Sequence, residues 1–250
     1  MYGWRAKLGR INPSPETVGD EEWRRLCPDG VTVVSTRMFI ERVDRDGLTA
    51  MVDNLERAVK ELATTRPDVI LMAGTAGAFN GGHGFDQELI QRMEATAPVP
   101  ATTTMSAVLA ALDALHIRKL AVATSYIQPV DDSLARVLAA AGLEVVAIRG
   151  MGILKSIDMG DVQPDATYRF ARQMLAEAHG ADGCLISCGN LRSLEAIAPL
   201  EADFGLPVVT SNQAALWAGL RMTNVKDPVQ GYGRLLRTVE NGKERGDGGA

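Results

Sequence analysis

The sequence predicts an α/β fold, with two similar lobes that each hold a mainly parallel sheet flanked by helices. Two observations predict it. Short apolar, β-branched runs alternate with amphipathic helical segments along the 250 residues, and three segments recur in the same order in both halves. Parallel strands are covered on both faces, so they are expected as continuous apolar runs rather than alternating ones. The alternation therefore favours strands joined by helical crossovers.

Five segments have the character of buried strands. They are 68–74 (DVILMAG), 119–125 (KLAVATS), 143–148 (LEVVAI), 183–189 (GCLISCG) and 206–211 (LPVVTS). Four other segments carry apolar residues at helical spacing, namely 48–65, 106–115, 131–142 and 166–180. Asp131 or Asp132 is suited to cap the start of the third of these helices. Gly142 and Gly180 suit the ends of the third and fourth.

The repeat is visible as three pairs of similar segments. Residues 5–14 resemble 117–126, residues 66–79 resemble 180–194, and residues 99–112 resemble 206–219. Any two strand–helix units look alike to some degree, which is the alternative explanation, but the shared order favours a duplicated half. We therefore predict a first lobe of residues 1–115 plus 212–240, a second lobe of 116–211, and a flexible tail of 241–250.

The repeat also predicts where a site lies. Aligning Asp68 with Asp182 sets Gly74 opposite Cys188, and aligning Lys7 with Lys119 sets Ser14 opposite Tyr126. In open α/β sheets, ligands bind outside the carboxyl ends of the strands. Two facing lobes would then bring the segments AGTAG, TSY and SCGN around one cleft.

Composition excludes several classes of protein. The net charge of −5, the pI near 5.3 and the scattered lysines and arginines give no basic surface for a nucleic acid. No apolar run reaches the roughly 18–20 residues of a membrane helix, and the first residues lack the apolar core of a signal peptide. We expect a cytoplasmic protein without membrane or nucleic-acid partners. Whether it forms a homo-oligomer stays open.

Cysteine and histidine usage predicts no disulfide framework and no metal site. The three cysteines are an odd number in a long chain, which is typical of a reducing compartment. His83, His116 and His179 lack the spacing of metal ligands. Cys27 lies in a predicted turn and matches no site motif.

Cys188 is the candidate reactive residue, because it follows an apolar strand directly and precedes a glycine and a helix. Amides and the positive end of a helix dipole favour a thiolate over a thiol, and such a sulfur can exchange protons with carbon. The alternative is a buried, inert thiol, the usual state of a free cysteine. Cys184 lies four residues earlier, inside the strand, where it is expected to fill the core.

These motifs carry a family resemblance. The segments LMAGTAGAF, PATTTMSAVLAAL, LAVATSYI, LISCGNLRSLEAI, LPVVTSNQAALWA and GYGRLL resemble the aspartate/glutamate racemase superfamily, in its branch that holds arylmalonate decarboxylase and maleate cis-trans isomerase. The resemblance covers nearly the whole chain. It implies a cofactor-free enzyme of two pseudo-symmetric lobes, with one or two catalytic cysteines at the lobe interface and a small carboxylic acid as substrate.

The resemblance also implies an oxyanion pocket. Decarboxylation without a metal or cofactor leaves an enediolate, whose oxygens need preorganised hydrogen-bond donors. The matching positions are Gly74, Thr75, Ala76 and Tyr126 with Gly189 and Asn190. Thr75 offers a hydroxyl and an amide, Tyr126 offers a phenol, and the others offer backbone amides. A helix-capping role for Thr75 and an interface-packing role for Tyr126 are the alternatives.

Four positions depart from the family pattern. Racemases and maleate isomerases of the superfamily carry a second cysteine where this chain has Gly74, so a two-base racemisation lacks one base. Ala76 replaces a hydroxyl residue of the decarboxylase, and Gly77 replaces a large apolar residue, which predicts a wider cavity. Glu16 stands where the isomerases carry a binding asparagine.

The sequence therefore favours a decarboxylase of a substituted malonate, in which Cys188 protonates the enediolate. Two alternatives stay open. One is a maleate-like cis-trans isomerase or related racemase. The other is a carboxylate-binding protein without catalysis, suggested by Gly74 and Ala76 together.

Overall fold

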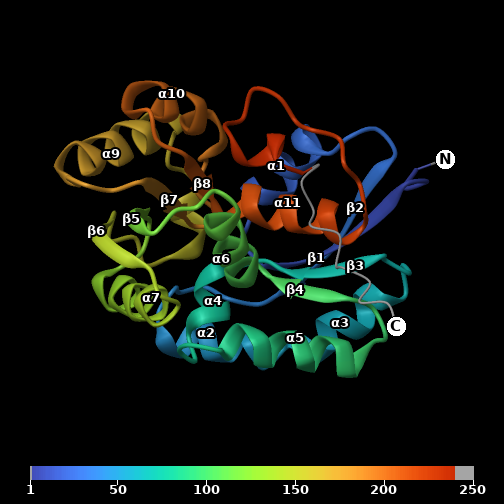
Figure 1. The fold of residues 1–250 in the computed structure, drawn as a ribbon. Helices are drawn as coiled ribbons and strands as arrows, with labels where there is room; N and C mark the ends of the chain where they lie inside the picture. Colours follow the sequence, from blue (N-terminus) through green and yellow to red (C-terminus); the bar gives the residue numbers. More distant parts are fainter. Residues whose placement is uncertain (1, 240–250) are drawn as a thin grey trace, which may run out of the picture.

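A computed structural model describes residues 2–239, and the predicted tail of 241–250 lies outside them. The chain forms two parallel four-stranded sheets flanked by helices, which confirms the predicted fold class (Figure 1). The first sheet has the order β2-β1-β3-β4, with β1 (Ala6–Pro13), β2 (Val31–Met38), β3 (Val69–Met72) and β4 (Ala101–Thr103). The second has the order β6-β5-β7-β8, with β5 (Lys119–Thr124), β6 (Glu144–Gly150), β7 (Gly183–Ser187) and β8 (Val208–Thr210).

The repeat extends to hydrogen bonds at the strand ends. The Lys7 amide donates to Asp68 Oδ2 at 2.7 Å, and the Lys119 amide donates to Asp182 Oδ1 at 2.9 Å. These are the two lysine–aspartate pairs that the sequence alignment matched. The pairing of β1 with β3 and that of β5 with β7 also share the same register within the repeat. Gly74 and Cys188 thus follow equivalent strands.

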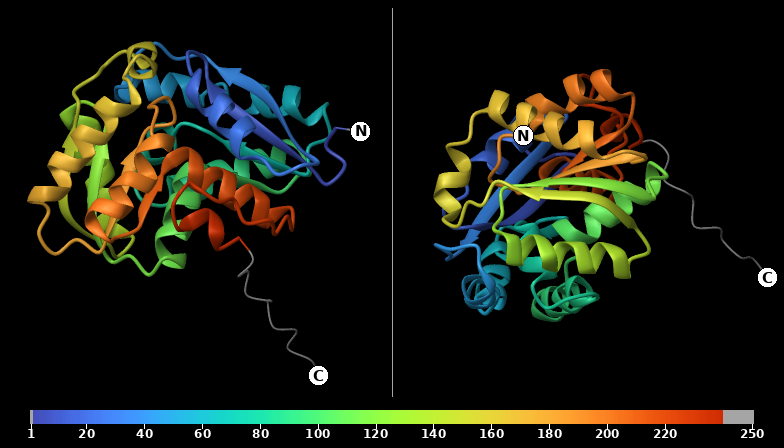
Figure 2. Two further views of the ribbon diagram at one scale, coloured as in Figure 1. Left: turned by 90° about the horizontal axis from the view of Figure 1, so that it is seen from above. Right: turned by 90° about the vertical axis from the view of Figure 1, so that its left-hand side faces the viewer.

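The helices cover both sheets in equivalent ways (Figure 2). In the first half, α1 (Val18–Leu26) contacts β2, and α3 (Leu55–Ala63) contacts β1 and β2. In the second half, α7 (Gln128–Ala140) contacts β6, and α9 (Pro164–Glu177) contacts β5 and β6. The remaining helices are α2 (Arg45–Val52), α4 (Thr75–Phe79), α5 (Phe85–Thr96), α8 (Ser156–Gly160), α10 (Leu194–Phe204) and η1 (Leu235–Arg237), with α6 and α11 described below.

Helices α6 (Thr104–Ala114) and α11 (Ser211–Met222) pack against each other between the sheets. Each begins after a threonine whose hydroxyl caps it: Thr103 accepts from the Ser106 amide, and Thr210 accepts from the Gln213 amide. Helix α11 also contacts β3 and α1 of the first half. The same helix also contacts β7 and β8 of the second half, so the predicted lobe boundaries stay a prediction.

Two local expectations are wrong. The helix predicted over 48–65 divides into α2 and α3 at Asp53 and Asn54, where the side-chain Nδ2 of Asn54 donates to the Ala50 carbonyl and so competes with the helical backbone. Helix α7 begins earlier than expected, at Gln128, so Asp131 and Asp132 lie inside it and cap nothing.

The two predicted terminal glycines do follow helices. Gly142 and Gly180 have φ of 84° and 85°, in the left-handed region that lets the chain turn away after α7 and α9. Within residues 2–239, no helix combines the length and the apolar character that crossing a membrane requires.

Candidate active site

A small cavity lies between the carboxyl ends of the two sheets. Its volume is about 30 Å³, room for no more than a couple of water molecules. Its walls come from both lobes: Pro13, Glu16, Ile40, Val43, Leu48, Met51, Gly74, Ala76, Gly77, Tyr126, Ser156, Met159, Cys188, Gly189 and Asn190. A substrate larger than this needs some of these side chains or segments to move.

The structure brings six of the seven predicted site residues to this cavity. Gly74, Ala76, Tyr126, Cys188, Gly189 and Asn190 line it. Thr75 is fully buried beside it, and its hydroxyl donates to Ser211 Oγ at 2.8 Å. The Thr75 hydroxyl is therefore engaged within the protein, which leaves its role in an oxyanion pocket a proposal.

Cys188 is held as a protonated thiol, which is opposite to the expectation from the motif. Burial raises the pKa of the thiol to about 11, and the charge of Glu16 adds to this. The Ser125 hydroxyl and the amides of Asn190 and Leu191 lower the pKa, but less than burial raises it. Helix α10 begins only at Leu194, so Cys188 does not sit at a helix end.

One contact with the buried thiol comes from the other side of the cavity. Cys188 is 4% exposed, and its Sγ lies 3.6 Å from Met159 Sδ, on the segment that follows β6. A thiol with a raised pKa is a poor nucleophile at neutral pH, but it retains the proton that a carbanion would take up.

Tyr126 supplies the main side-chain donor. It is 3% exposed, and burial followed by the proximity of Cys188 raises its pKa well above 10, while the nearby hydroxyls of Ser187 and Thr75 lower it less. The phenol is therefore protonated at neutral pH. Its ring packs edge-on against Phe79, with the ring centroids 6.3 Å apart. The ring thus packs in the core, and donation by the phenol to a ligand stays a prediction.

The loop after Cys188 is fixed by bonds to both lobes. Asn190 Oδ1 accepts from the Thr17 amide at 3.0 Å, and Asn190 Nδ2 donates to the Ser156 carbonyl at 2.8 Å. The Gly189 carbonyl accepts from Asn212 Nδ2 at 2.8 Å. The side chain of Asn190 is thus engaged within the protein.

Two segments that the sequence reasoning missed cover the cavity. The Val43 amide donates to the Leu154 carbonyl at 2.8 Å, and the Ser156 amide donates to the Glu41 carbonyl at 3.0 Å. These bonds join the segment after β2 to the segment after β6. Both segments leave equivalent strands at their carboxyl ends, which is the signal that could have found them.

The wider cavity expected at Gly77 is not observed. A Cβ on Gly77 would collide with Met51 Cε, so the methionine methyl fills the space that the missing side chain leaves. Within the glycine-rich segment 74–84, Thr75–Phe79 forms the buried helix α4.

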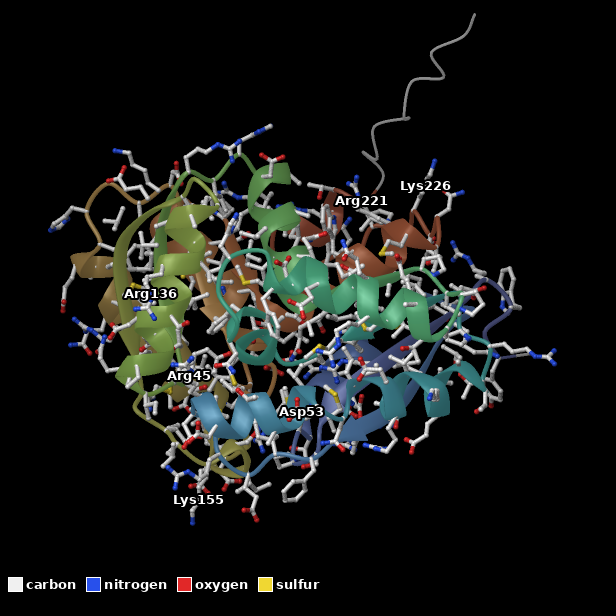
Figure 3. The ribbon with its side chains drawn as sticks, turned by 90° about the horizontal axis from the view of Figure 1, so that it is seen from below. Arg45, Asp53, Arg136, Lys155, Arg221 and Lys226 are labelled. Carbon is white, nitrogen blue, oxygen red and sulfur yellow. The ribbon has the colours of Figure 1, made fainter. Side chains whose placement is uncertain are left out.

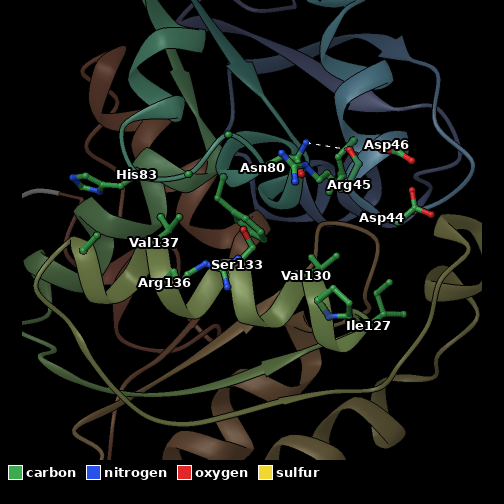
Figure 4. A pocket seen from close by; sticks show the side chains of 16 residues that line it. Asp44, Arg45, Asp46, Asn80, His83, Ile127, Val130, Ser133, Arg136 and Val137 are labelled. Carbon is green, nitrogen blue, oxygen red and sulfur yellow. Dashed lines mark hydrogen bonds between the residues drawn. The ribbon is translucent and has the colours of Figure 1, made fainter.

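A larger groove of about 800 Å³ lies between α2, the Asn80–His83 loop and α7, and it shares Leu48 with the small cavity. Arg45 and Arg136 project there from α2 and α7 (Figures 3 and 4). Neither arginine has a carboxylate within 4.0 Å among the described residues. The groove is open and lacks a buried nucleophile or acid, so we place the chemistry in the small cavity.

Comparison with known proteins identifies the family of the chain. The sequence profile of the arylmalonate decarboxylase family matches residues 9–236. The chain belongs to this family. The match spans every residue that lines the small cavity. Within residues 2–239, no group of three or more His, Cys, Asp or Glu side chains is arranged to hold a metal ion.

The relatives of this chain include decarboxylases and maleate isomerases. The arylmalonate decarboxylase of Bordetella bronchiseptica is 31% identical over 230 residues, which are 92% of this chain and 95% of that protein. The maleate isomerase of Nocardia farcinica is 30% identical over 209 residues, which are 81% of this chain and 82% of that protein. These relatives are enzymes, and their names do not decide which reaction this chain catalyses.

Solved structures show the same fold. The Nocardia farcinica maleate cis-trans isomerase bound to TRIS has a TM-score of 0.89 at 25% identity, covering 93% of this chain and 98% of that chain. A double mutant of arylmalonate decarboxylase in the liganded form has a TM-score of 0.87 at 30% identity, covering 92% of this chain and 98% of that chain. A mutant of the Nocardia isomerase carries a covalently bound succinylcysteine intermediate, at a TM-score of 0.89 and 26% identity.

Proposed function

We propose that this chain is a cofactor-independent decarboxylase of a substituted malonate, with Cys188 as the proton donor. The observation that carries the proposal is a buried thiol with a pKa raised to about 11, in the same cavity as the protonated phenol of Tyr126. A decarboxylase needs the thiol form, because the proton must be present when the carbanion forms.

In the proposed reaction, one substrate carboxylate is held by the Tyr126 phenol and the backbone amides of Gly189 and Asn190. The other lies against the apolar wall formed by Ile40, Val43, Leu48 and Met51. The bond between this carboxylate and the α-carbon breaks, carbon dioxide leaves, and the electron pair moves into an enediolate. Donors aimed at the enediolate oxygens stabilise it.

Cys188 then gives its proton to the α-carbon, and the resulting thiolate regains a proton from solvent before the next turnover. Because no second thiol occupies Gly74, the proton arrives on one face only. With a disubstituted malonate, whose product has a stereocentre at the α-carbon, the product is therefore expected to be optically pure.

A second candidate is cis-trans isomerisation of a maleate-like diacid. The fold similarity to the Nocardia isomerase and its succinylcysteine intermediate favour it. That chemistry would need Cys188 as a thiolate that adds to the double bond, with the proton transfers supplied by groups other than a second cysteine.

Product analysis separates the candidates. We expect incubation with a substituted malonate to release carbon dioxide and yield the corresponding monocarboxylic acid, and incubation with maleate to yield no fumarate. Fumarate alone would contradict the decarboxylase proposal and support the isomerase. Binding of either acid without any product would indicate a carboxylate-binding protein.

The pH dependence of turnover gives an independent prediction. If the thiol is the active form, it stays protonated well below its raised pKa of about 11. The kcat for decarboxylation is then expected to be constant from pH 7 to 9. If the thiolate were active, its fraction and the rate would rise about tenfold per pH unit over that range. Steady-state kinetics at saturating substrate distinguishes the two.

Tyr126→Phe removes one donor and keeps the ring against Phe79. We expect kcat to fall by about 10²-fold, as for the loss of one oxyanion donor, with little change in melting temperature. Tyr168→Phe is the matched control, because the Tyr168 hydroxyl bonds Asp203 on the exposed surface. Equal rates in Tyr126→Phe and the parent would mean that Tyr126 serves only in packing.

A further inference from the structure

Glu16 lies in the turn between β1 and α1 and lines the cavity with Cys188 and Gly189. It is 1% exposed, and its Oε1 accepts from Arg10 Nη2 at 2.5 Å. Its Oε2 is buried and has no hydrogen-bond partner among the described residues. A buried acceptor without a partner lowers stability, and native proteins nearly always satisfy such groups. This oxygen is therefore available to a donor from outside the chain.

Two glycines make room for this carboxylate. A Cβ on Gly19 would collide with Glu16 Oε1 and with Arg10 Nη2, so the ion pair depends on a bare backbone there. A Cβ on Gly189 would lie 3.0 Å from Glu16 Oε2. The free oxygen is thus in close contact with the loop that carries Cys188.

The surrounding charges set which ligand group fits. Arg10 is shared between Glu16, Asp20 at 3.1 Å and the Asn212 oxygen at 3.1 Å. Glu22 accepts from Asn212 Nδ2 at 2.7 Å on the far side of this network. One buried guanidinium therefore serves two carboxylates. A substrate carboxylate placed at Oε2 would meet a like charge, whereas a hydroxyl or ammonium group would donate to it.

We propose that Glu16 selects the substrate by accepting a hydrogen bond from a hydroxyl or ammonium group on the α-carbon. The inference rests on the proposed decarboxylase function and names its substrate class as small α-hydroxy- or α-aminomalonates.

Three probes test the proposal, because methylmalonate, hydroxymalonate and aminomalonate differ in one α-substituent of similar size. We expect kcat/KM for carbon dioxide release to be at least about tenfold higher for hydroxymalonate and aminomalonate than for methylmalonate, as for a hydrogen bond to a charged group. Dissociation constants measured by calorimetry for the same probes, with Cys188→Ala to prevent turnover, should follow the same order.

Glu16→Gln sharpens the test. Arg10 only donates, so the glutamine oxygen must face it, and the amide NH₂ then faces the cavity as a donor. We expect the variant to lose the preference for aminomalonate over methylmalonate. Glu22→Gln is the matched control, because both Glu22 oxygens accept bonds within the protein and Glu22 does not line the cavity. This control should keep the parent's ranking of the probes.

The outcomes separate this proposal from the proposed function. Carbon dioxide release with methylmalonate equal to or better than the other probes would overturn the role of Glu16 and leave the decarboxylase intact. Binding in the expected order, without carbon dioxide release, would support Glu16 and overturn the decarboxylase. If Glu16→Gln does not fold, the parent's ranking of the three probes alone decides the proposal.

Discussion

Replacing Cys188 by serine is expected to lower kcat for decarboxylation by about 10²–10⁴-fold, the usual contribution of a positioned general acid. A serine hydroxyl is a far weaker acid than a thiol, even one whose pKa is raised to about 11. The fold should be kept, because the smaller side chain faces Met159 and the cavity rather than a packed strand interface. Turnover measured as carbon dioxide release, together with a thermal melt, checks both parts.

Cys184→Ser is the matched control, four residues earlier and inside β7. Cys184 is fully buried in β7 and does not line the cavity. A buried, unpaired hydroxyl there should lower the free energy of unfolding by about 1–3 kcal/mol. Its rate per folded molecule should stay near that of the parent. Unchanged turnover in Cys188→Ser, or a comparable loss of rate in Cys184→Ser, would contradict the single-thiol mechanism.

Much of the fold could be predicted because it depends on local patterns. Apolar runs and helical spacing located β3, β5, β6, β7 and β8, and the duplicated lysine–aspartate pairs aligned the two halves correctly. The break between α2 and α3 was missed, because apolar residues continue at helical spacing across Asp53 and Asn54.

The candidate site could be predicted only in part. The position of Cys188 follows from the strand that precedes it, and so does its place at the edge of the sheet. The pKa of its thiol depends on burial by Met159, which comes from the segment after a different strand. The bond from Thr75 to Ser211 likewise joins parts that are distant in sequence. Such contacts form only in the folded chain, so no local sequence motif can predict them.

The two halves of the repeat differ most at the pair Gly74 and Cys188. Gly74 has φ of 92° and ψ of 77°, in the left-handed region, whereas Cys188 is not among the non-glycine residues with positive φ in the described part of the chain. The first lobe thus lacks both the thiol and the backbone geometry that suits it. A second acid at this place requires a strained residue.

Gly74→Cys is therefore expected to fold with a loss of stability of about 1–2 kcal/mol, the cost of a left-handed conformation for a residue with a Cβ. The new Cβ would lie 3.1 Å from Pro13 Cγ and 3.7 Å from Met51 Cε, which is tight but not a collision with backbone. The added thiol would face Cys188 across the α-carbon. We expect the variant to racemise optically pure 2-phenylpropionate, which the parent should leave unchanged.

Chiral chromatography of the acid measures racemisation, and exchange of the α-proton in deuterium oxide measures proton transfer on each face. Gly74→Ala is the matched control, because it carries the same backbone strain without a thiol. It should lose as much stability and cause no racemisation. A Gly74→Cys protein that folds and binds the acid, yet leaves it optically pure, would contradict the symmetry of the two lobes about the α-carbon. Racemisation by the parent would require a second base opposite Cys188, and the single-donor mechanism would then be wrong.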